Sequence, residues 1–214
     1  GEIIETPGEL FARVAKFSAN SPEQEKEFFD AMINLDFMPN SPVLFNFGRN
    51  GGKPLGSACF VLVPEDSIDS IFGTLNDAAQ LLRHGAGVGF AFSKIRSEGS
   101  FISSTHGQST GPLPYIKVYN ELANAIKQGS YRRSALMGIL DVSHPDIEKF
   151  IAAKFEDGQL ENFNISVAIT DKFMEALKNK KQFTLIDPHT KQKIKEIDVE
   201  KLFNSICKYA HGSG

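Results

Sequence analysis

The residues most able to do chemistry in this sequence are its two cysteines, which stand in different surroundings. Cys59 opens an apolar run that Pro64 ends, and the small residues 56–58 precede it. Such a run is typical of a strand buried on both faces, which places the Cys59 thiol at a strand end, where α/β folds hold their sites. The alternative is a small core residue. Cys207 falls in an apolar helical pattern, so we expect it to be packed inside the protein.

Glycines form a second candidate site in the motif Gly85-Ala86-Gly87-Val88-Gly89. The spacing GxGxG differs from the dinucleotide-binding GxGxxG and follows a predicted helix rather than a strand, so a Rossmann site is not indicated. Two interpretations stay open. The glycines make a tight turn between a helix and a strand, or their bare backbone lets a ligand come close.

A cationic segment between a predicted helix and a predicted strand contains Lys127, Gln128, Arg132 and Arg133. Arginine and lysine beside a glutamine are able to bind phosphate and to read the edge of a base. The alternative is a charged turn that faces solvent. Arg96 offers a further phosphate contact.

Composition excludes several functional classes. Lys and Arg total 23 against 26 Asp and Glu, a formal net charge of −3, so no basic surface for nucleic acid is indicated. The five histidines are scattered and the sequence has no CxxC motif, so we expect no metal site. No apolar run approaches the roughly 18–20 residues of a membrane span, and the first residues do not resemble a signal peptide. We therefore expect a soluble cytoplasmic protein that binds neither nucleic acid nor membranes.

The elements that must position these residues start with helices. Two start signals, Thr6-Pro7-Gly8-Glu9 and Ser21-Pro22-Glu23-Gln24, predict two helices before residue 38. Pro39 and Pro42 are expected to forbid a helix where they stand, and residues 46–56, rich in Gly and Asn, to form a loop.

From residue 57 onward apolar strands alternate with amphipathic helices, which predicts an α/β fold with a mostly parallel sheet. Residues 97–112 should form a loop, and 183–186 with 193–197 a hairpin-like pair. Four strands are expected to share one sheet, near 59–63, 89–92, 135–140 and 163–169. Helices are expected to start near Asp66-Ser67 and His144-Pro145-Asp146 and to cover 113–127, 172–178 and 199–209.

Several motifs, in the order in which they occur, resemble those of one known family. They are similar to the catalytic chain of ribonucleotide reductases, specifically the adenosylcobalamin-dependent class II enzymes, from near residue 1 to about residue 210. The motifs are Pro39-Asn40-Ser41-Pro42, Ser57-Ala58-Cys59-Phe60-Val61-Leu62, Glu65-Asp66-Ser67, Gly85-Ala86-Gly87-Val88-Gly89-Phe90, Lys127-Gln128-Gly129 with Arg132-Arg133, Met137-Gly138-Ile139-Leu140, His144-Pro145-Asp146-Ile147 and Asn162-Phe163-Asn164-Ile165-Ser166-Val167.

The resemblance implies an organisation in two parts. Residues 1–38 match an N-terminal helical segment, and residues 39–214 match part of the family's ten-stranded α/β barrel with its effector-binding loops, truncated at the C-terminal side. The family's radical-forming cysteine lies later in its sequence, and so does the resolving partner of its first redox cysteine. The resemblance therefore implies that this chain alone is inactive and needs the remaining C-terminal part of the reductase.

The resemblance also assigns roles to individual positions. Cys59 matches the first redox cysteine, which donates electrons to the ribose 2′ position and becomes half of a disulfide. Ser41, Ala58, Cys59 and Gly87 match positions that contact the substrate ribonucleotide. The specificity site, which binds a deoxynucleoside triphosphate effector, is matched by Asp66, Ser67, Arg96, Lys127, Gln128, Arg132 and Arg133.

Further implications concern cofactor and partners. The complete enzyme would use adenosylcobalamin, a thioredoxin-like reductant would reduce the disulfide, and a homodimer would form through the helices near 69–82 and 113–127. Two alternatives stay open: a large-subunit fragment of a class I reductase, and a non-catalytic nucleotide-binding and assembly module.

Overall fold

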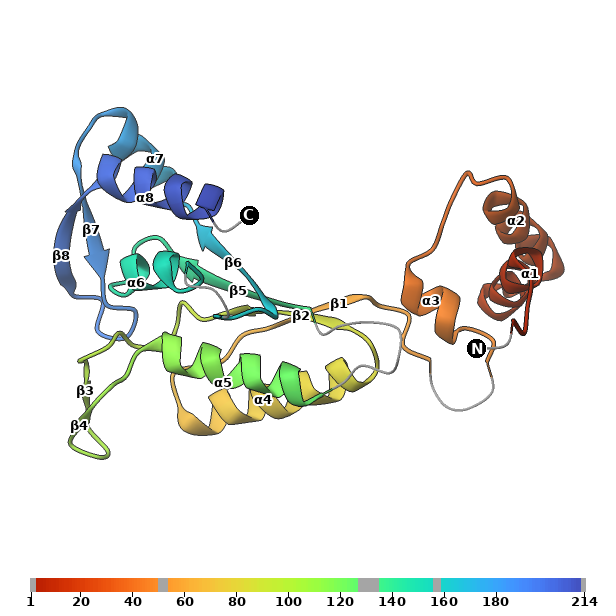
Figure 1. Cartoon of the computed structure of the whole chain (residues 1–214), viewed down its shortest axis with the longest axis horizontal. Helices are drawn as coiled ribbons and strands as arrows, with labels where there is room; N and C mark the ends of the chain where they lie inside the picture. Colours follow the sequence, from red (N-terminus) through yellow and green to blue (C-terminus); the bar gives the residue numbers. More distant parts are fainter. Residues whose placement is uncertain (1–2, 50–53, 127–134, 156–158, 213–214) are drawn as a thin grey trace.

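The computed structural model describes residues 3–49, 54–126, 135–155 and 159–212, and Figure 1 shows a helical part followed by an α/β part. Each part has its own cluster of buried apolar side chains. The helical part consists of α1 (Pro7–Ser18), α2 (Pro22–Ile33) and α3 (Ser41–Asn46).

The predicted helix starts are confirmed in the helical part. The Thr6 hydroxyl accepts a hydrogen bond from the Glu9 N–H at 3.3 Å, and the Glu9 carboxylate accepts one from the Thr6 N–H at 2.7 Å. This reciprocal pair satisfies donors that a helix start leaves without intrahelical partners. Ser21 caps α2 in the same way through the Gln24 N–H.

The expectation that Pro39 and Pro42 forbid a helix was wrong for α3. Asn40 caps this helix by accepting a hydrogen bond from the Val43 N–H at 3.0 Å, and Pro42 stands in its first turn. A proline costs nothing there, because its missing N–H would have no intrahelical partner. The α3 side chains Val43 and Leu44 pack on the buried apolar cluster of the helical part. The predicted domain boundary between residues 38 and 39 stays a prediction.

Four parallel strands in the order β1-β2-β5-β6 form the sheet of the α/β part, so the prediction that these four segments share one sheet is confirmed. Helices connect successive strands, as parallel pairing requires. The strands are β1 (Cys59–Leu62), β2 (Gly87–Ala91), β5 (Leu136–Asp141) and β6 (Phe163–Ala168). The connecting helices are α4 (Ile68–Arg83), α5 (Pro112–Ala125) and α6 (Ile147–Ala152).

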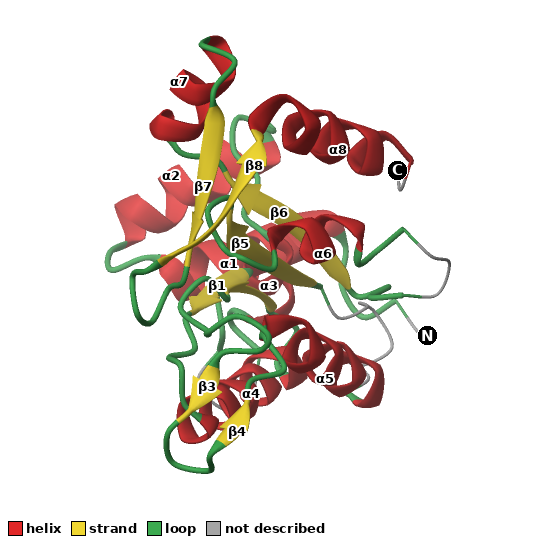
Figure 2. Cartoon of the chain, turned by 90° about the vertical axis from the view of Figure 1, so that its left-hand side faces the viewer, coloured by secondary structure: helices red, strands yellow, loops and turns green. Residues whose placement is uncertain are grey.

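The segment after β6 folds beside this sheet (Figure 2). The predicted hairpin is confirmed, with its strands antiparallel, and α7 and α8 pack against it and each other. These elements are α7 (Asp171–Lys178), β7 (Gln182–Ile186), β8 (Lys193–Asp198) and α8 (Val199–Gly212).

One face of the sheet is covered by helices. The ring of Tyr119 on α5 meets Phe90 of β2 edge-on at 4.8 Å, and its hydroxyl donates to the Ile71 carbonyl on α4 at 2.6 Å. Burial raises the pKa of Tyr119 far above its ordinary value, so the phenol keeps the proton that it donates. This contact fixes α4, α5 and β2 to one another, and Figure 1 shows the two helices lying side by side.

The opposite face of the sheet is open. Alternate residues of the strands point to it, and among them Cys59, Val61, Met137 and Asn164 are exposed. Val61 exposes 77% of its surface, although it lies inside a strand. Apolar side chains in a parallel strand are ordinarily covered on both faces, so this face is suited to packing against further structure.

Three local expectations need correction. Cys207 is exposed on α8 rather than packed, because the apolar side of that helix is formed by its neighbours Leu202, Phe203 and Ile206. Residues 97–112 are not all loop, since β3 (Phe101–Ile102) pairs with β4 (Gly107–Gln108). Of the three motif glycines, Gly85 makes the turn, with φ +83°, whereas the other two belong to β2.

Candidate functional site

Three of the predicted substrate-contact residues meet at the amino end of the sheet. Cys59 is the first residue of β1 and is the register partner of Gly87 in β2. The Gly87 N–H donates to the Ala58 carbonyl at 2.7 Å, so the three backbones lie together. A Cβ on Gly87 would lie 3.3 Å from the Ala135 carbonyl oxygen, a tight approach that favours glycine. The Cys59 thiol is exposed on the open face.

Ser41, the fourth predicted substrate contact, opens α3. Its neighbour Asn40 donates to the Gly56 carbonyl at 3.0 Å, which ties α3 to the segment that leads into β1. The hydrogen bonds of the described residues do not join Ser41 to Ala58, Cys59 or Gly87. Its place in a substrate pocket therefore stays a prediction.

At the opposite, carboxyl end of the sheet, two predicted effector residues are joined. The Asp66 carboxylate accepts from the Arg96 backbone N–H at 3.1 Å and from its Nε at 2.7 Å. Arg96 Nη1 also donates to the Phe101 carbonyl at 3.2 Å, and the guanidinium keeps further donors for a ligand. The Ser67 hydroxyl caps α4 by accepting from the Ser70 N–H at 3.2 Å. Asp66 and Ser67 thus stand where α4 begins, and Arg96 beside them.

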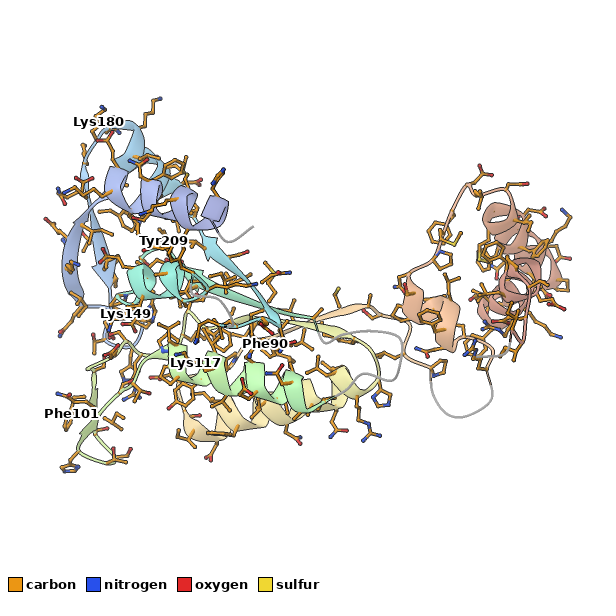
Figure 3. The ribbon with its side chains drawn as sticks, viewed as in Figure 1. Phe90, Phe101, Lys117, Lys149, Lys180 and Tyr209 are labelled. Atoms are coloured by element: carbon orange, nitrogen blue, oxygen red, sulfur yellow. The ribbon has the colours of Figure 1, made fainter. Side chains whose placement is uncertain are left out.

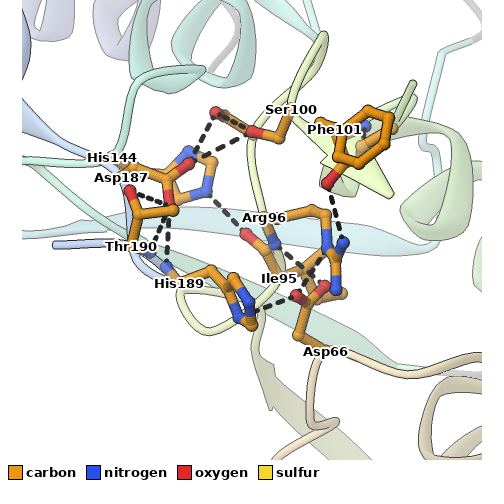
Figure 4. A network of polar contacts seen from close by, with 12 residues as sticks. Asp66, Ile95, Arg96, Ser100, Phe101, His144, Asp187, His189 and Thr190 are labelled. Atoms are coloured by element: carbon orange, nitrogen blue, oxygen red, sulfur yellow. Dashed lines mark hydrogen bonds and ion pairs between the residues drawn. The ribbon is translucent and has the colours of Figure 1, made fainter. Parts of the chain in front are cut away.

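The loop that carries Arg96 is held by buried polar groups from distant segments (Figure 4). His144 Nε2 lies 2.8 Å from the Ile95 carbonyl oxygen. Because the Asp146 N–H donates to His144 Nδ1, Nε2 carries the ring proton and donates to that carbonyl. The Asp146 carboxylate accepts from the Glu98 N–H at 2.9 Å. These contacts anchor the backbone of the loop to the segment before α6.

Asp187 holds the same loop from the β7–β8 hairpin. It is 2% exposed, and its carboxylate accepts hydrogen bonds from the hydroxyls of Ser97 and Ser100 and from the backbone of His189 and Thr190. Burial raises the pKa of Asp187, but these hydrogen bonds to the ionised form outweigh burial, so its pKa lies below the ordinary value. His189 Nδ1 also lies 3.6 Å from the Asp66 carboxylate.

A cavity of about 970 Å³ lies on the other side of this loop. The loop contributes Glu98 and Gly99, and α5 and α6 contribute Lys117 and Lys149, while Tyr209 of α8 closes another side. Figure 3 shows Lys117, Lys149 and Tyr209 on these three helices. The Arg96 loop therefore has an anchored side and a side that faces a cavity with two lysines.

Four predicted effector residues, Lys127, Gln128, Arg132 and Arg133, lie outside the described residues. Their described flanks, Ile126 after α5 and Ala135 before β5, lie at the amino end of the sheet, because α5 starts at the carboxyl end and runs back along the strands (Figure 1). Asp66 and Arg96 lie at the other end.

The sequence analysis did not single out Asp187, His144 or Asp146 as site residues. Asp187 falls in the connection of the hairpin-like pair predicted for 183–186 and 193–197, and His144-Pro145-Asp146 was predicted to start a helix and to match a family motif. One local signal points to Asp187: an aspartate in a turn favours hydrogen bonds from the backbone N–H groups of its own turn to its carboxylate. The distant partners of these side chains depend on the tertiary fold.

The described ranges contain no group of three or more His, Cys, Asp or Glu side chains arranged to hold a metal ion. In the same ranges no helix is long and apolar enough to cross a bilayer.

Comparison with known proteins assigns the chain to a family. Residues 1–52 match the all-alpha domain of ribonucleotide reductase, and residues 57–212 match its barrel domain. The vitamin B12-dependent ribonucleoside-diphosphate reductase of Mycobacterium tuberculosis is 40% identical over all of this chain and 32% of its own length. A protein of the same description from Thermoplasma acidophilum is 42% identical over 86% of this chain and 24% of its own length.

A further relative is the ribonucleoside-diphosphate reductase large chain of Cryptosporidium parvum, 32% identical over 99% of this chain and 27% of its own length. The chain thus spans about a third or less of the curated relatives it matches. The resemblance seen in the motifs is confirmed, and so is the mixed α/β fold with N-terminal helices. Since the barrel-domain match alone covers well over half of the residues, the chain belongs to the ribonucleotide reductase large-chain family.

Proposed function

We propose that this chain is part of a ribonucleotide reductase that converts ribonucleotides to deoxyribonucleotides by radical chemistry. It supplies the first redox cysteine, part of the substrate pocket and part of the specificity site. The observation that carries the proposal is the meeting of Ala58, Cys59 and Gly87 at the amino end of the sheet, with the Cys59 thiol exposed beside the glycine backbone. Such a surface lets a ribose approach the sulfur closely.

The redox step is a two-electron exchange. Cys59 and a second cysteine, supplied by the remaining part of the barrel, lose two electrons and two protons and form a disulfide. The substrate takes them up, its 2′ C–O bond breaks, and the oxygen leaves as water. A thioredoxin-like dithiol then restores the two thiols by exchange, which requires an accessible sulfur such as that of Cys59.

Adenosylcobalamin is proposed for the complete enzyme, where it would supply the radical that starts the reaction. In the described residues, the hydrogen bonds and strand pairing at Cys59 involve the Ser57 hydroxyl and backbone amides, which do not make a seat for a corrinoid. No step at Cys59 is therefore assigned to this cofactor. Its seat belongs to the rest of the barrel.

The specificity site is proposed to form between two copies of the chain. Within one copy, Asp66 and Arg96 lie at one end of α4 and α5, and the ends of the segment that contains Lys127 to Arg133 lie at the other. A two-fold axis across α4 and α5 would place the copies antiparallel and bring the two sets together. Phe72 and Val118, exposed on these helices, supply apolar surface for the contact.

Calorimetry with the four deoxynucleoside triphosphates tests this site. We expect the folded chain to bind at least one of them, and Arg96→Ala to weaken binding about 10-fold or more through loss of a charge-assisted contact. Arg49→Ala, the same change in the helical part, is the matched control and should bind like the wild type. Nucleotide should also promote dimers in sedimentation. Unchanged binding by Arg96→Ala, or no binding by a folded dimer, contradicts the site.

Two other candidates are separated by turnover. A non-catalytic nucleotide-binding module would bind nucleotide but give no deoxyribonucleotide when combined with the remaining part of the barrel. A class I large-subunit fragment, an alternative to which the 32% identity with the Cryptosporidium parvum large chain is relevant, would need a second protein rather than adenosylcobalamin for turnover.

A further inference from the structure

The hairpin β7–β8 makes a contact that the family assignment does not explain. Its strands pair with each other and not with the parallel sheet, yet Asp187, directly after β7, reaches the loop between β2 and β3. The residues that Asp187 binds there, Ser97 and Ser100, lie 90 and 87 positions away in the sequence. Such a buried link between two connecting segments that are far apart in the sequence holds them in one position relative to each other.

We propose that Asp187 is a positioning residue for the effector site: it locks the tip of the β7–β8 hairpin to the loop that carries Arg96 and so fixes where that loop faces a nucleotide. This inference rests on the proposed effector site. It assigns to the hairpin a role in nucleotide binding at the effector site, separate from the substrate pocket.

The two carboxylate oxygens of Asp187 bind two different segments. Oδ2 accepts from the hydroxyls of Ser97 at 3.2 Å and Ser100 at 3.1 Å, both on the loop. Oδ1 accepts from the backbone N–H groups of His189 at 2.9 Å and Thr190 at 2.7 Å, both on the hairpin. Because one buried carboxylate serves both segments, neither moves without leaving a charged oxygen unsatisfied, which is costly in the interior.

The link reaches Arg96 by two routes. Ser97 follows Arg96 in the chain, and it is 4% exposed, so its position constrains the backbone on which the guanidinium stands. His189, whose N–H binds Asp187, also places its ring 3.6 Å from the Asp66 carboxylate that holds Arg96 (Figure 4). The hairpin tip therefore contacts Asp66 through His189 and reaches Arg96 through its chain neighbour Ser97.

The far side of the same loop faces the cavity with Lys117 and Lys149. A displacement of the loop by the hairpin would alter that cavity wall together with Arg96. The anchors at Ile95 and Glu98 act on the backbone, whereas Asp187 acts on the two serine hydroxyls. Removing the hydroxyls thus cuts the bonds between Asp187 and the loop, together with the 3.0 Å contact between the Ser97 and Ser100 hydroxyls, and leaves the anchors at Ile95 and Glu98 in place.

Hydrogen exchange and nucleotide binding test the inference in matched variants of the full 214-residue chain. The double variant Ser97→Ala, Ser100→Ala removes the hydroxyls that join the loop to Asp187. Thr190→Val is the control, because it removes the 3.1 Å bond from a hydroxyl to the same carboxylate but on the hairpin side. Asp187→Asn is the conservative variant, since its amide still accepts from the hairpin and donates to the serine oxygens.

The first readout is the hydrogen-exchange rate of the Gly99, Ser100 and Ser109 amides, whose N–H groups donate to the carbonyls of Ser109, Ser97 and Ser100, respectively. The second readout is the affinity for deoxynucleoside triphosphates. We expect the double variant to exchange these amides about 5- to 10-fold faster and to bind nucleotide about 3- to 10-fold more weakly. Thr190→Val should stay within about 2-fold of the wild type in both, and Asp187→Asn, which keeps the link but loses the charge, should fall between Thr190→Val and the double variant. If the double variant does not stay folded, Ser100→Ala alone gives the same comparison at a half-buried site.

Unchanged exchange and binding in the double variant would overturn the inference, and so would an equal effect of Thr190→Val, which would show general loosening of the hairpin. A wild-type chain that binds no nucleotide contradicts the proposed effector site instead. The exchange rates then still decide whether Asp187 holds the loop.

Discussion

Asp66 binds Arg96 at two points, once through the backbone N–H and once through Nε, and so joins the start of α4 to the loop after β2. Both side chains are largely withdrawn from solvent, at 16% and 18% exposure. Their neighbours Glu65 and Lys94 form a second ion pair between the same two segments, but with 61% and 54% of their side-chain surfaces exposed. The two pairs therefore differ mainly in their access to water.

Double-mutant cycles on the free energy of unfolding should separate these two pairs. For Asp66→Ala with Arg96→Ala we expect a coupling of about 1–2 kcal/mol, because a partly buried, doubly bonded pair is poorly screened. For Glu65→Ala with Lys94→Ala we expect about 0–0.5 kcal/mol, as for exposed ion pairs. Equal couplings would mean that Asp66 does not hold Arg96 in place.

Gly111 occupies a position that other residues do not tolerate. Its φ is +74°, and an added Cβ would lie 2.7 Å from the Asp146 carboxylate and 3.0 Å from the Glu98 nitrogen, the two groups whose hydrogen bond anchors the loop. We expect Gly111→Ala to lower stability by about 3 kcal/mol or more, since backbone strain adds to the loss of this bond. Thermal or denaturant unfolding measures the change.

Gly99→Ala is the matched control for that substitution. Gly99 also has a positive φ, of +80°, but a Cβ there would meet nothing within 4 Å. Only strain should then count, at about 1 kcal/mol. If Gly99→Ala and Gly111→Ala cost the same, the close approach of Gly111 to Asp146 has no energetic weight.

The ionisation of Asp187 should appear in the pH dependence of stability. Its pKa is lowered on folding, so its contribution is fully present above the ordinary Asp value of about 3.9 and is lost as the pH falls through the lower pKa of the folded state. At pH 7 we expect Asp187→Asn to cost about 1 kcal/mol, and near pH 2 about nothing.

Urea unfolding of wild type and variant at several pH values follows this difference. The exposed Asp36→Asn serves as the control, and its cost should be small at every pH. A cost of Asp187→Asn that stays constant down to pH 2 would contradict the role of the charged form.

Local signals were enough to predict most of the secondary structure. Thr6 and Ser21 cap helices where their types and spacing indicate, because capping depends on a few adjacent residues. The four parallel strands followed from continuous apolar runs. The helix at Ser41 was missed because Pro42 stands in its first turn, where a proline does not break a helix. Cys207 was misplaced because an apolar helix still has an exposed side.

The site was predictable only in part. Cys59 and Gly87 face each other because adjacent parallel strands align their starts, which the strand pattern already indicates. The bonds of Asp187 to Ser97 and Ser100 depend on where a hairpin packs after 90 residues of intervening chain, and no local pattern encodes that. Buried polar pairs of this kind are satisfied by tertiary structure, so they become visible only in the fold.

The last prediction concerns the two thiols. Both Cys59 and Cys207 are exposed, so both should react with a maleimide in the folded chain. Only Cys59 lies beside the Gly87 backbone on the open face of the sheet. Combined with the remaining part of the barrel, the Cys59→Ser variant should therefore lose turnover with dithiol reductants by at least about 1,000-fold, since serine does not form the disulfide.

Cys207→Ser makes the same atomic change at an exposed helix position and should keep turnover close to that of the wild type, with both variants unfolding at the wild-type temperature. The two substitutions differ only in where the sulfur stands, so a difference in turnover is attributable to the site. Turnover retained by Cys59→Ser, or lost equally in both variants, would remove Cys59 from the redox role, because electrons would then reach the ribose by a route that does not use the thiol at the start of β1.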